Sequence, residues 1–322
     1  MRTPARFGLE FTAAPALRRL LITHGIDIVF AWGTQAAVAA GSARAGNCAL
    51  VIERFAPNIT DAEAKSIKSI AHQPKFAVAC SSATVRRRMI EKGLPVPTCV
   101  VIRPGVDFAA INAARKDESL RQDLGLKPHE RMVLASYPLT RTGGLDRIAW
   151  SGHLLNFIQP GSRMVLFGTS PECKRVQELS KTMSHPNANV WAGSNQRYEN
   201  LIAISDCLVI TPLGDVSTTP IAWAMAAGVS VIGSAVYAIA ELIAHKHNGH
   251  LIKPQRGPNM TIRIAAALKQ IDAMTKEKEV ARGQAYQVFG VRRFADQHLQ
   301  LYKNLTTGND PGKDITDSAV ET

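Results

Sequence analysis

Three consecutive hydroxyl side chains precede a predicted helix in the second half of the chain. They are Ser217, Thr218 and Thr219, and the helix is expected to cover 220–227 and to end at Gly228. The first turn of a helix has backbone N–H groups without intrahelical partners, and its dipole favours negative charge. These groups suit a phosphate or a sugar hydroxyl, although an ordinary N-cap would have the same sequence.

A resemblance of the second half of the chain to a known family implies a second candidate anion site, in the loop after the predicted strand 131–135. This loop contains Arg141, Gly143 and Gly144. The arginine would supply a cation, or would simply be solvated, and the glycines would offer backbone N–H groups to a phosphate. The two loops together suggest a site for a phosphorylated ligand.

The elements that must position these loops alternate along the chain. Apolar runs of strand length are separated by longer helical patterns, which is typical of βαβ units and a parallel sheet. Ligands bind such doubly wound sheets at the carboxyl ends of the strands. No G-x-G-x-x-G follows a strand and opens a helix, which disfavours a dinucleotide-dependent dehydrogenase. The expected strands are 27–31, 49–52, 75–79, 98–102, 131–135, 162–167, 188–191, 207–211, 229–232 and 250–253.

Composition narrows the classes of protein and partner. The chain has 322 residues, enough for two domains, and 38 basic against 26 acidic residues give a net charge of +12. That surface would attract nucleotide diphosphates or acidic lipids, or is an ordinary solubility surface. Aromatic residues make up 6%, too few for base-stacking platforms, so no nucleic-acid partner is expected.

The cysteines and the apolar runs bear on location. Five cysteines without C-x-x-C spacing lie mostly in apolar runs, which predicts buried reduced thiols and no metal site. No apolar run is long enough to span a bilayer, and 1–10 lacks the core of a signal peptide. We therefore expect a cytoplasmic protein, with contact to a membrane surface through its basic charge left open.

Seven segments, in order, resemble glycosyltransferase family 4 within the group 1 glycosyl transferases, which have the GT-B fold. The most specific is A-W-A-M-A-A-G-V-S-V-I at 222–232; the others are 102–107, 167–171, 190–193, 198–206, 240–243 and 248–254. The resemblance implies two Rossmann-like, doubly wound parallel-sheet domains. It also implies retaining transfer of a sugar from a nucleotide-diphosphate sugar to a glycan or lipid-linked acceptor, without a metal or other cofactor.

The resemblance also implies a division of the chain. Residues 1–107 would form an acceptor-side domain and 108–282 the nucleotide-sugar-binding domain. A helix at 283–305 would pack back on the first domain, and 306–322 would be a disordered tail. The family's opening strand and Gly-Gly loop are not recognisable here, so the first domain is expected to be short and incomplete.

The site residues implied by the resemblance fall into three groups. Asp215 occupies the position of a glutamate near the transferred sugar and is the candidate catalytic residue, unless it only forms a turn. The donor would be bound by Arg141, Gly143, Gly144, Gly168, Ser217, Thr218, Thr219 and Trp223. The acceptor side would be lined by Trp32, Gly33, Thr34 and Arg54, although Glu53 could pair with Arg54 at the surface.

Several charged positions of the family are replaced, which leaves two hypotheses open. Pro138 and Gly143 stand where the family has an arginine and a lysine, and Trp223 stands where a glutamate grips the ribose. Trp223 would stack on a ring or fill the core. The first hypothesis is a divergent glycosyltransferase, and the second is a catalytically inactive glycosyltransferase-like binding or scaffold protein.

Overall fold

The computed structural model describes residues 10–44, 47–114, 119–135, 139–140, 143–182, 188–193, 196–255, 258–270 and 273–317. It divides into two compact units. Unit 1 consists of Met1–Gly105 and Arg292–Ser318, and unit 2 consists of Val106–Val291 and Ala319–Thr322. Unit 1 is therefore built from two stretches that are far apart in the sequence.

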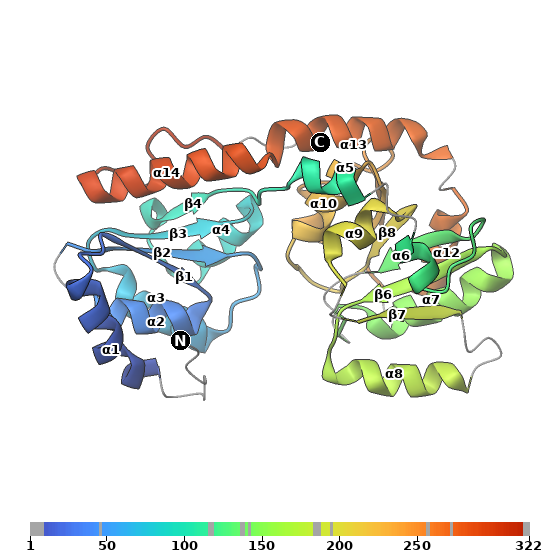
Figure 1. Cartoon of the computed structure of the whole chain (residues 1–322), viewed down its shortest axis with the longest axis horizontal. Coiled ribbons are helices and arrows are strands. Elements are labelled where there is room, and N and C mark those ends of the chain that lie inside the picture. The colour runs from blue at the N-terminus through green and yellow to red at the C-terminus, as the bar shows by residue number, and fades with distance from the viewer. Residues whose placement is uncertain are drawn as a thin grey trace. The chain divides into compact units, whose positions relative to one another are not determined.

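Unit 1 contains a four-stranded parallel sheet with the order β1-β2-β3-β4 (Figure 1). The strands are β1 (Ile28–Trp32), β2 (Ala49–Arg54), β3 (Phe76–Cys80) and β4 (Cys99–Val101), as the apolar runs predict. The parallel register places Trp32 beside Glu53, and Glu53 beside Ala79. The side chains that follow these strands therefore lie along one edge of the sheet.

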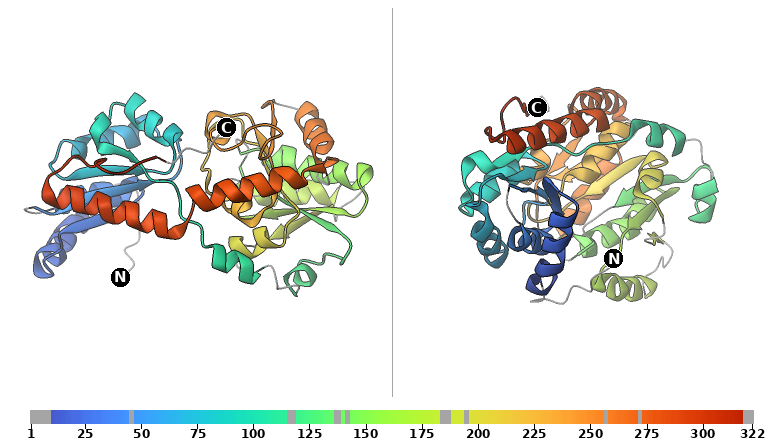
Figure 2. Two further views of the ribbon diagram at one scale, coloured as in Figure 1. Left: turned by 90° about the horizontal axis from the view of Figure 1, so that it is seen from above. Right: turned by 60° about the vertical axis from the view of Figure 1, so that its left-hand side comes forward.

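Helices cover both faces of this sheet. α2 (Thr34–Ala43), α3 (Asp61–Ala71) and α4 (Ala83–Glu91) pack on one face, and α1 (Glu10–Thr23) packs on α2. The short helix η1 (Val96–Thr98) leads into β4. On the other face, α14 (Val291–Thr307) runs along the sheet (Figure 2). Its Leu301 and Leu305 pack with small or branched side chains of the central strands.

The C-terminal region differs from the expectation in two ways. The predicted helix 283–305 is two helices, because α13 (Thr275–Val288) ends before Phe289 and α14 starts at Val291. The predicted disordered tail is wrong as far as Asp317. Asn304 donates to the carbonyls of Pro311 and Lys313 at 3.0 and 2.7 Å, and Arg103 pairs with Asp317 at 2.8 Å.

Unit 2 contains a six-stranded parallel sheet in which the strand order reverses. The order is β10-β9-β8-β5-β6-β7, so β6 and β7 are added on one side of β5, and β8, β9 and β10 are then added on its other side. These strands are β5 (Arg131–Ala135), β6 (Ser162–Phe167), β7 (Asn189–Ala192), β8 (Cys207–Ile210), β9 (Ser230–Ser234) and β10 (His250–Ile252).

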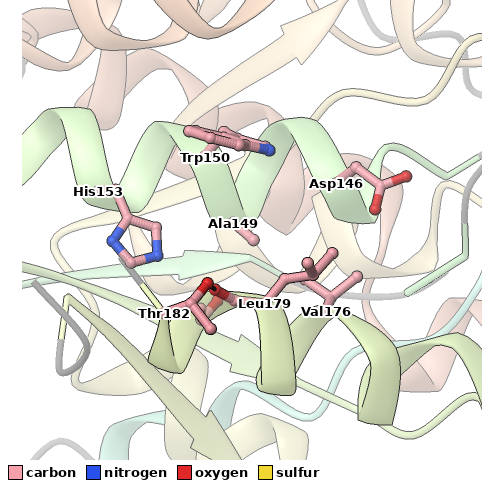
Figure 3. Close-up of a pocket in the computed structure, with 8 residues that line it drawn as sticks. Asp146, Ala149, Trp150, His153, Val176, Leu179 and Thr182 are labelled. Carbon is pink, nitrogen blue, oxygen red and sulfur yellow. Dashed lines mark hydrogen bonds between the residues drawn. The ribbon is translucent and has the colours of Figure 1, made fainter. Parts of the chain in front are cut away.

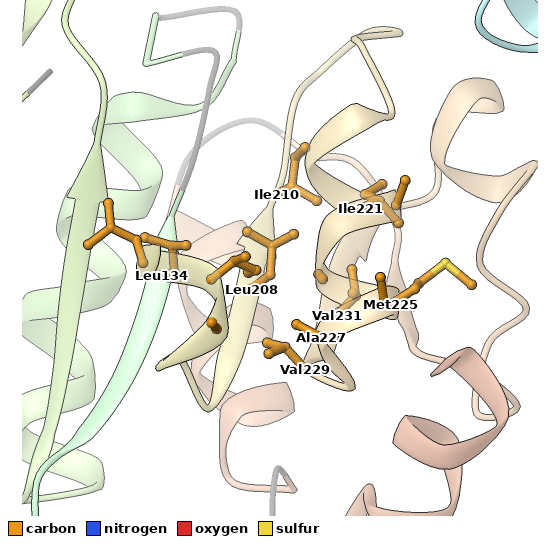
Figure 4. Packing of buried hydrophobic residues seen from close by; sticks show 14 of the residues in the cluster. Leu134, Leu208, Ile210, Ile221, Met225, Ala227, Val229 and Val231 are labelled. Atoms are coloured by element: carbon orange, nitrogen blue, oxygen red, sulfur yellow. The ribbon is translucent and has the colours of Figure 1, made fainter. Parts of the chain in front are cut away.

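Two helical layers enclose this sheet. α7 (Leu145–Ile158), α8 (Pro171–Lys181) and α12 (Pro258–Leu268) pack on one face. The opposite face carries α13 together with α5 (Phe108–Ala114), α6 (Ser119–Asp123), α9 (Tyr198–Ala203), α10 (Thr219–Ala227) and α11 (Tyr237–Ala240). Figure 4 shows the packing between β8 and α10, where Leu208 and Ile210 lie close to Ile221. None of the described helices is both long and apolar enough to cross a membrane.

Candidate functional site

The reversal of strand order in unit 2 creates a switch point between β5 and β8. In open parallel sheets, ligands bind in the crevice at the carboxyl ends of the two strands that flank such a point. The loops at this position follow Ala135 and Ile210, and each leads into a helix, α7 or α10. Both loops are those singled out in the sequence.

Gly144 joins these two loops by a close backbone contact. It has φ 97° and ψ 15° and precedes the first residue of α7. A Cβ added to Gly144 would lie 2.7 Å from the carbonyl oxygen of Thr211. Only glycine fits both the conformation and the space, so Gly144 fixes the approach of one loop to the other.

The backbone N–H of Gly143, which the sequence suggests as a phosphate donor, already has a hydrogen-bond partner. Its N–H donates to the hydroxyl of Thr140 at 3.0 Å, which stabilises the turn that leads into α7. Arg141, the expected cation of this loop, lies outside the described residues.

A different arginine lies at the switch point and was missed in the sequence. The Nη2 atom of Arg147 lies 3.1 Å from the position that a Cβ on Gly144 would take. Arg147 is in the first turn of α7, three residues after Gly144. The signal that could have found it is a cation in the first turn of the helix that follows the glycine pair, where its side chain can return toward the loop.

The hydroxyl groups of the second loop lie at the start of α10, as predicted. Thr218 is its N-cap residue and makes no side-chain cap bond, and Gly228 ends the helix at φ 62°. Ser217 Oγ donates to Thr219 Oγ1 at 3.1 Å. The hydroxyl of Thr211 is buried and has no hydrogen-bond partner among the described residues. A buried hydroxyl in this state favours a polar ligand or water.

Asp215 is buried within the same loop. It is 7% exposed, and its Oδ1 accepts a hydrogen bond from the backbone N–H of Ala238 at 2.9 Å. Ala238 lies in the first turn of α11, so the carboxylate stabilises the start of that helix. The carboxylate therefore has a structural contact in addition to the predicted catalytic role.

The remaining donor-side residues have clear local roles. Trp223 is partly buried and packs against the core beneath α10, as the core-filling alternative expects. Gly168 has φ 121° directly after β6, and a Cβ there would lie 3.7 Å from Leu139 in the loop after β5. Gly168 thus turns the chain beside that loop.

The acceptor-side residues lie at the carboxyl edge of the sheet in unit 1. Trp32 is 70% exposed and packs edge-on against Phe30 and Phe55. Gly33 has φ 84° and precedes α2. Trp32 therefore presents an aromatic surface at the end of β1, on a turn that needs glycine.

Polar contacts hold the rest of this edge. Glu63 accepts a hydrogen bond from Thr34 at 3.1 Å and pairs with Arg54 at 3.5 Å. Glu63 also completes a capping box with Thr60 at the start of α3. The suggested surface pairing of Glu53 with Arg54 is wrong, because Glu53 is buried.

Glu53 instead forms a buried pair with His298 of α14. The carboxylate is 2% exposed, and its Oε2 lies 3.1 Å from His298 Nε2. Its second oxygen has no partner among the described residues. Burial raises the pKa of Glu53, and the hydrogen bond and charge of His298 oppose that rise. The signal available in the sequence was a carboxylate directly after the apolar run at 49–52, within the same strand.

All five cysteines are buried and free, as predicted. Burial raises the pKa of the Cys207 thiol far above its ordinary value, which makes it unreactive. Among the described residues, no three His, Cys, Asp or Glu side chains are grouped to hold a metal ion.

The two parallel-sheet units, one with the reversed strand order, define the GT-B fold of glycosyltransferases, and solved structures agree. The chain is similar to HepE from Anabaena in complex with UDP-glucose, with a TM-score of 0.76 and 20% identity over 91% of this chain and 83% of that one. It is also similar to sucrose-phosphate synthase from Thermosynechococcus elongatus, with a TM-score of 0.76 and 17% identity over 95% and 81%.

The family model for glycosyl transferases group 1 matches residues 116–284, and the chain belongs to that family. A curated relative is N-acetyl-alpha-D-glucosaminyl L-malate synthase from Bacillus anthracis, 24% identical over 152 residues. That match spans 47% of this chain but only 40% of the relative, so less than half of the relative's length is compared.

Proposed function

We propose that the protein transfers a sugar from a nucleotide-diphosphate donor bound at the switch point of unit 2. The observation that carries this proposal is the contact between Gly144 and Thr211, which brings the loop after β5 to the hydroxyl-rich loop before α10. The matched family acts on activated sugars, and the HepE structure contains UDP-glucose, which makes uridine nucleotides the first probes.

In this proposal the leaving diphosphate is stabilised by cations and by hydroxyl and backbone donors. Arg147 lies beside Gly144 and would replace part of the positive charge lost at Pro138 and Gly143; Arg141 would add to it. The hydroxyls of Ser217 and Thr219 and the start of α10 would bind phosphate oxygens. No metal is required, since these groups supply the positive potential.

The finer assignments rest on the motif resemblance. Membership of glycosyltransferase family 4 and retention of the anomeric configuration come from the segment at 222–232 and from Asp215 in its expected place. The acceptor would be a glycan or a lipid-linked sugar that contacts Trp32, Gly33 and Thr34. Arg54 would be less available to it, because Arg54 is paired with Glu63.

The test is isothermal titration of the full chain with UDP, GDP, UDP-glucose and GDP-mannose. Arg147→Met and Thr219→Val should each weaken nucleotide binding by about tenfold, which corresponds to the loss of one good phosphate contact of about 1.4 kcal/mol. Gly214→Ala is the matched control in the same loop, because no atom lies within 4 Å of the added Cβ. Affinity should also fall as salt screens the site.

Asp215 needs a variant that preserves its structural contact. Asp215→Asn keeps an oxygen to accept the N–H of Ala238 while removing the charge, so it should bind nucleotide but release no sugar from the donor. Absence of nucleotide binding by the folded wild-type chain would reject the transferase and leave the inactive binding or scaffold protein as the better explanation.

A further inference from the structure

A groove lies between α7 and α8 of unit 2 (Figure 3). It has a volume of about 390 Å³. Small-molecule sites in proteins have volumes of about 300–1,000 Å³. The groove is therefore large enough for a ligand of the size of a sugar residue.

The floor and sides of this groove are apolar, but two of the apolar side chains are open to solvent. Ala149 and Val176 are buried at its base. Trp150 of α7 is 56% exposed and Leu179 of α8 is 53% exposed. An indole and a leucine left in water over a hollow provide a surface against which an apolar ligand face can pack.

Polar groups stand at both ends of the groove. Asp146 lies at one end and contributes a carboxylate, whose partner Arg175, at 2.6 Å, does not itself line the groove. His153 lies at the other end, with its ring centroid 6.5 Å from that of Trp150, and Ser180 and Thr182 add hydroxyls. Figure 3 shows Asp146 and His153 on opposite sides of Ala149.

This combination matches the chemistry of a sugar ring. A pyranose has a face of C–H groups that packs on an indole ring, and a rim of hydroxyl groups that donate to carboxylates and exchange hydrogen bonds with hydroxyl side chains. A purely aliphatic ligand would make no hydrogen bonds with the carboxylate and hydroxyl groups that line the groove. An anionic ligand would meet the carboxylate of Asp146.

We propose that the α7–α8 groove is a saccharide-binding site separate from the donor site. The groove begins in the first turn of α7 and extends along the helix to His153, away from the strand ends where the nucleotide is proposed to bind. This site on unit 2 would bind one sugar residue of a glycan. The site does not depend on transferase activity, because its ligand is recognised by the groove alone.

The test is saturation-transfer NMR and titration of the full chain with maltotetraose, chitotetraose and mannotetraose. One of these probes should bind with a Kd of about 0.1–10 mM, the range of contacts with a small open site. Trp150→Ala should weaken that binding at least about tenfold, as loss of the stacking surface predicts. Trp150→Phe should restore part of it.

Phe157→Ala is the matched control. Phe157 is an aromatic residue of the same helix, is 61% exposed, and does not line the groove. Equal binding by wild type and by Trp150→Ala, or equal losses in Trp150→Ala and Phe157→Ala, would overturn the proposal. Failure of all three probes to bind the folded chain at about 20 mM would do the same.

Competition with UDP separates this site from the donor site. Saccharide binding should be unchanged at saturating UDP, whereas displacement by UDP would overturn the proposal by placing the sugar in the donor site. If saccharides bind but no nucleotide does, the groove proposal stands while the proposed transferase function fails.

Discussion

Replacing Gly152 of α7 by alanine should destabilise unit 2, although alanine favours helix. A Cβ on Gly152 would lie 2.0 Å from Asn189 Oδ1 and 2.8 Å from the Cβ of Met164. Met164 Cβ is fixed to the backbone of β6, so it cannot move aside alone. The buried Asn189 side chain is held by its hydrogen bond to the carbonyl of Ala149 at 3.1 Å.

The magnitude follows from three opposing contributions. Overpacking of a well-packed core costs about 1–3 kcal/mol, and displacement of Asn189 loses one buried hydrogen bond of about 1 kcal/mol. The gain in helix propensity from glycine to alanine is about 1 kcal/mol. Gly152→Ala should therefore lower the free energy of unfolding by about 1–3 kcal/mol, which lowers Tm by about 2–12 °C for a domain of this size.

Gly283 of α13 provides a control with the opposite sign. It also lies inside a helix, but no atom lies within 4 Å of its added Cβ. Gly283→Ala should raise the free energy of unfolding by up to about 1 kcal/mol. Thermal and urea unfolding of both variants, followed by circular dichroism, make the comparison. If the two variants shift stability in the same direction, the close packing of α7 on the sheet is not what Gly152 provides.

Three further predictions concern Gly144 in the proposed donor site and the buried pair of Glu53 and His298. Gly144→Ala should cost at least about 2 kcal/mol and weaken UDP binding, because left-handed backbone and the Thr211 carbonyl both oppose a Cβ; urea unfolding and titration should show both effects. His298→Leu should lower the free energy of unfolding by about 1–3 kcal/mol, because it leaves the buried Glu53 carboxyl without its hydrogen-bond partner. The cost should be smaller in the Glu53→Gln background. Additive costs in a double-mutant cycle would contradict the pairing. Folding raises the pKa of Glu53, so this group's contribution to stability is complete below its ordinary pKa of 4.5 and is lost as the pH rises through the raised pKa. Over this pH range the wild type should lose stability relative to Glu53→Gln. Urea unfolding at successive pH values measures the difference.

Much of the fold of unit 2 was predictable because its signals are local. Its strand β8 is an uninterrupted apolar run, and Gly228 ends α10 in the left-handed conformation that favours glycine. The position of the hydroxyl groups at the start of α10 was also predictable, since the start of this helix can be recognised in the sequence. The close contact of Gly144 with Thr211 also needed glycine, but its partner is set by strand order and not by neighbouring residues.

The features that were missed depend on residues far apart in the chain or on side-chain direction. Glu53 and His298 are 245 positions apart, so only the packing of α14 on β2 brings them together. Arg147 is an ordinary first-turn arginine until its side chain is placed beside Gly144. The break after Val288 divides what reads as one helical pattern, because amphipathic periodicity continues across it.

The split of unit 1 into two sequence segments sets the order in which the protein can fold during synthesis. The last strand of its sheet ends at Val101, but the helix that covers one face, α14, begins at Val291. At ribosomal rates of 5–20 residues per second, the intervening roughly 190 residues take about 10–40 s to make. During that time the face formed by Ala49, Val51 and Ala77 has no cover from α14. A chain released before α14 is made would keep an open apolar sheet, which chaperones and proteases recognise.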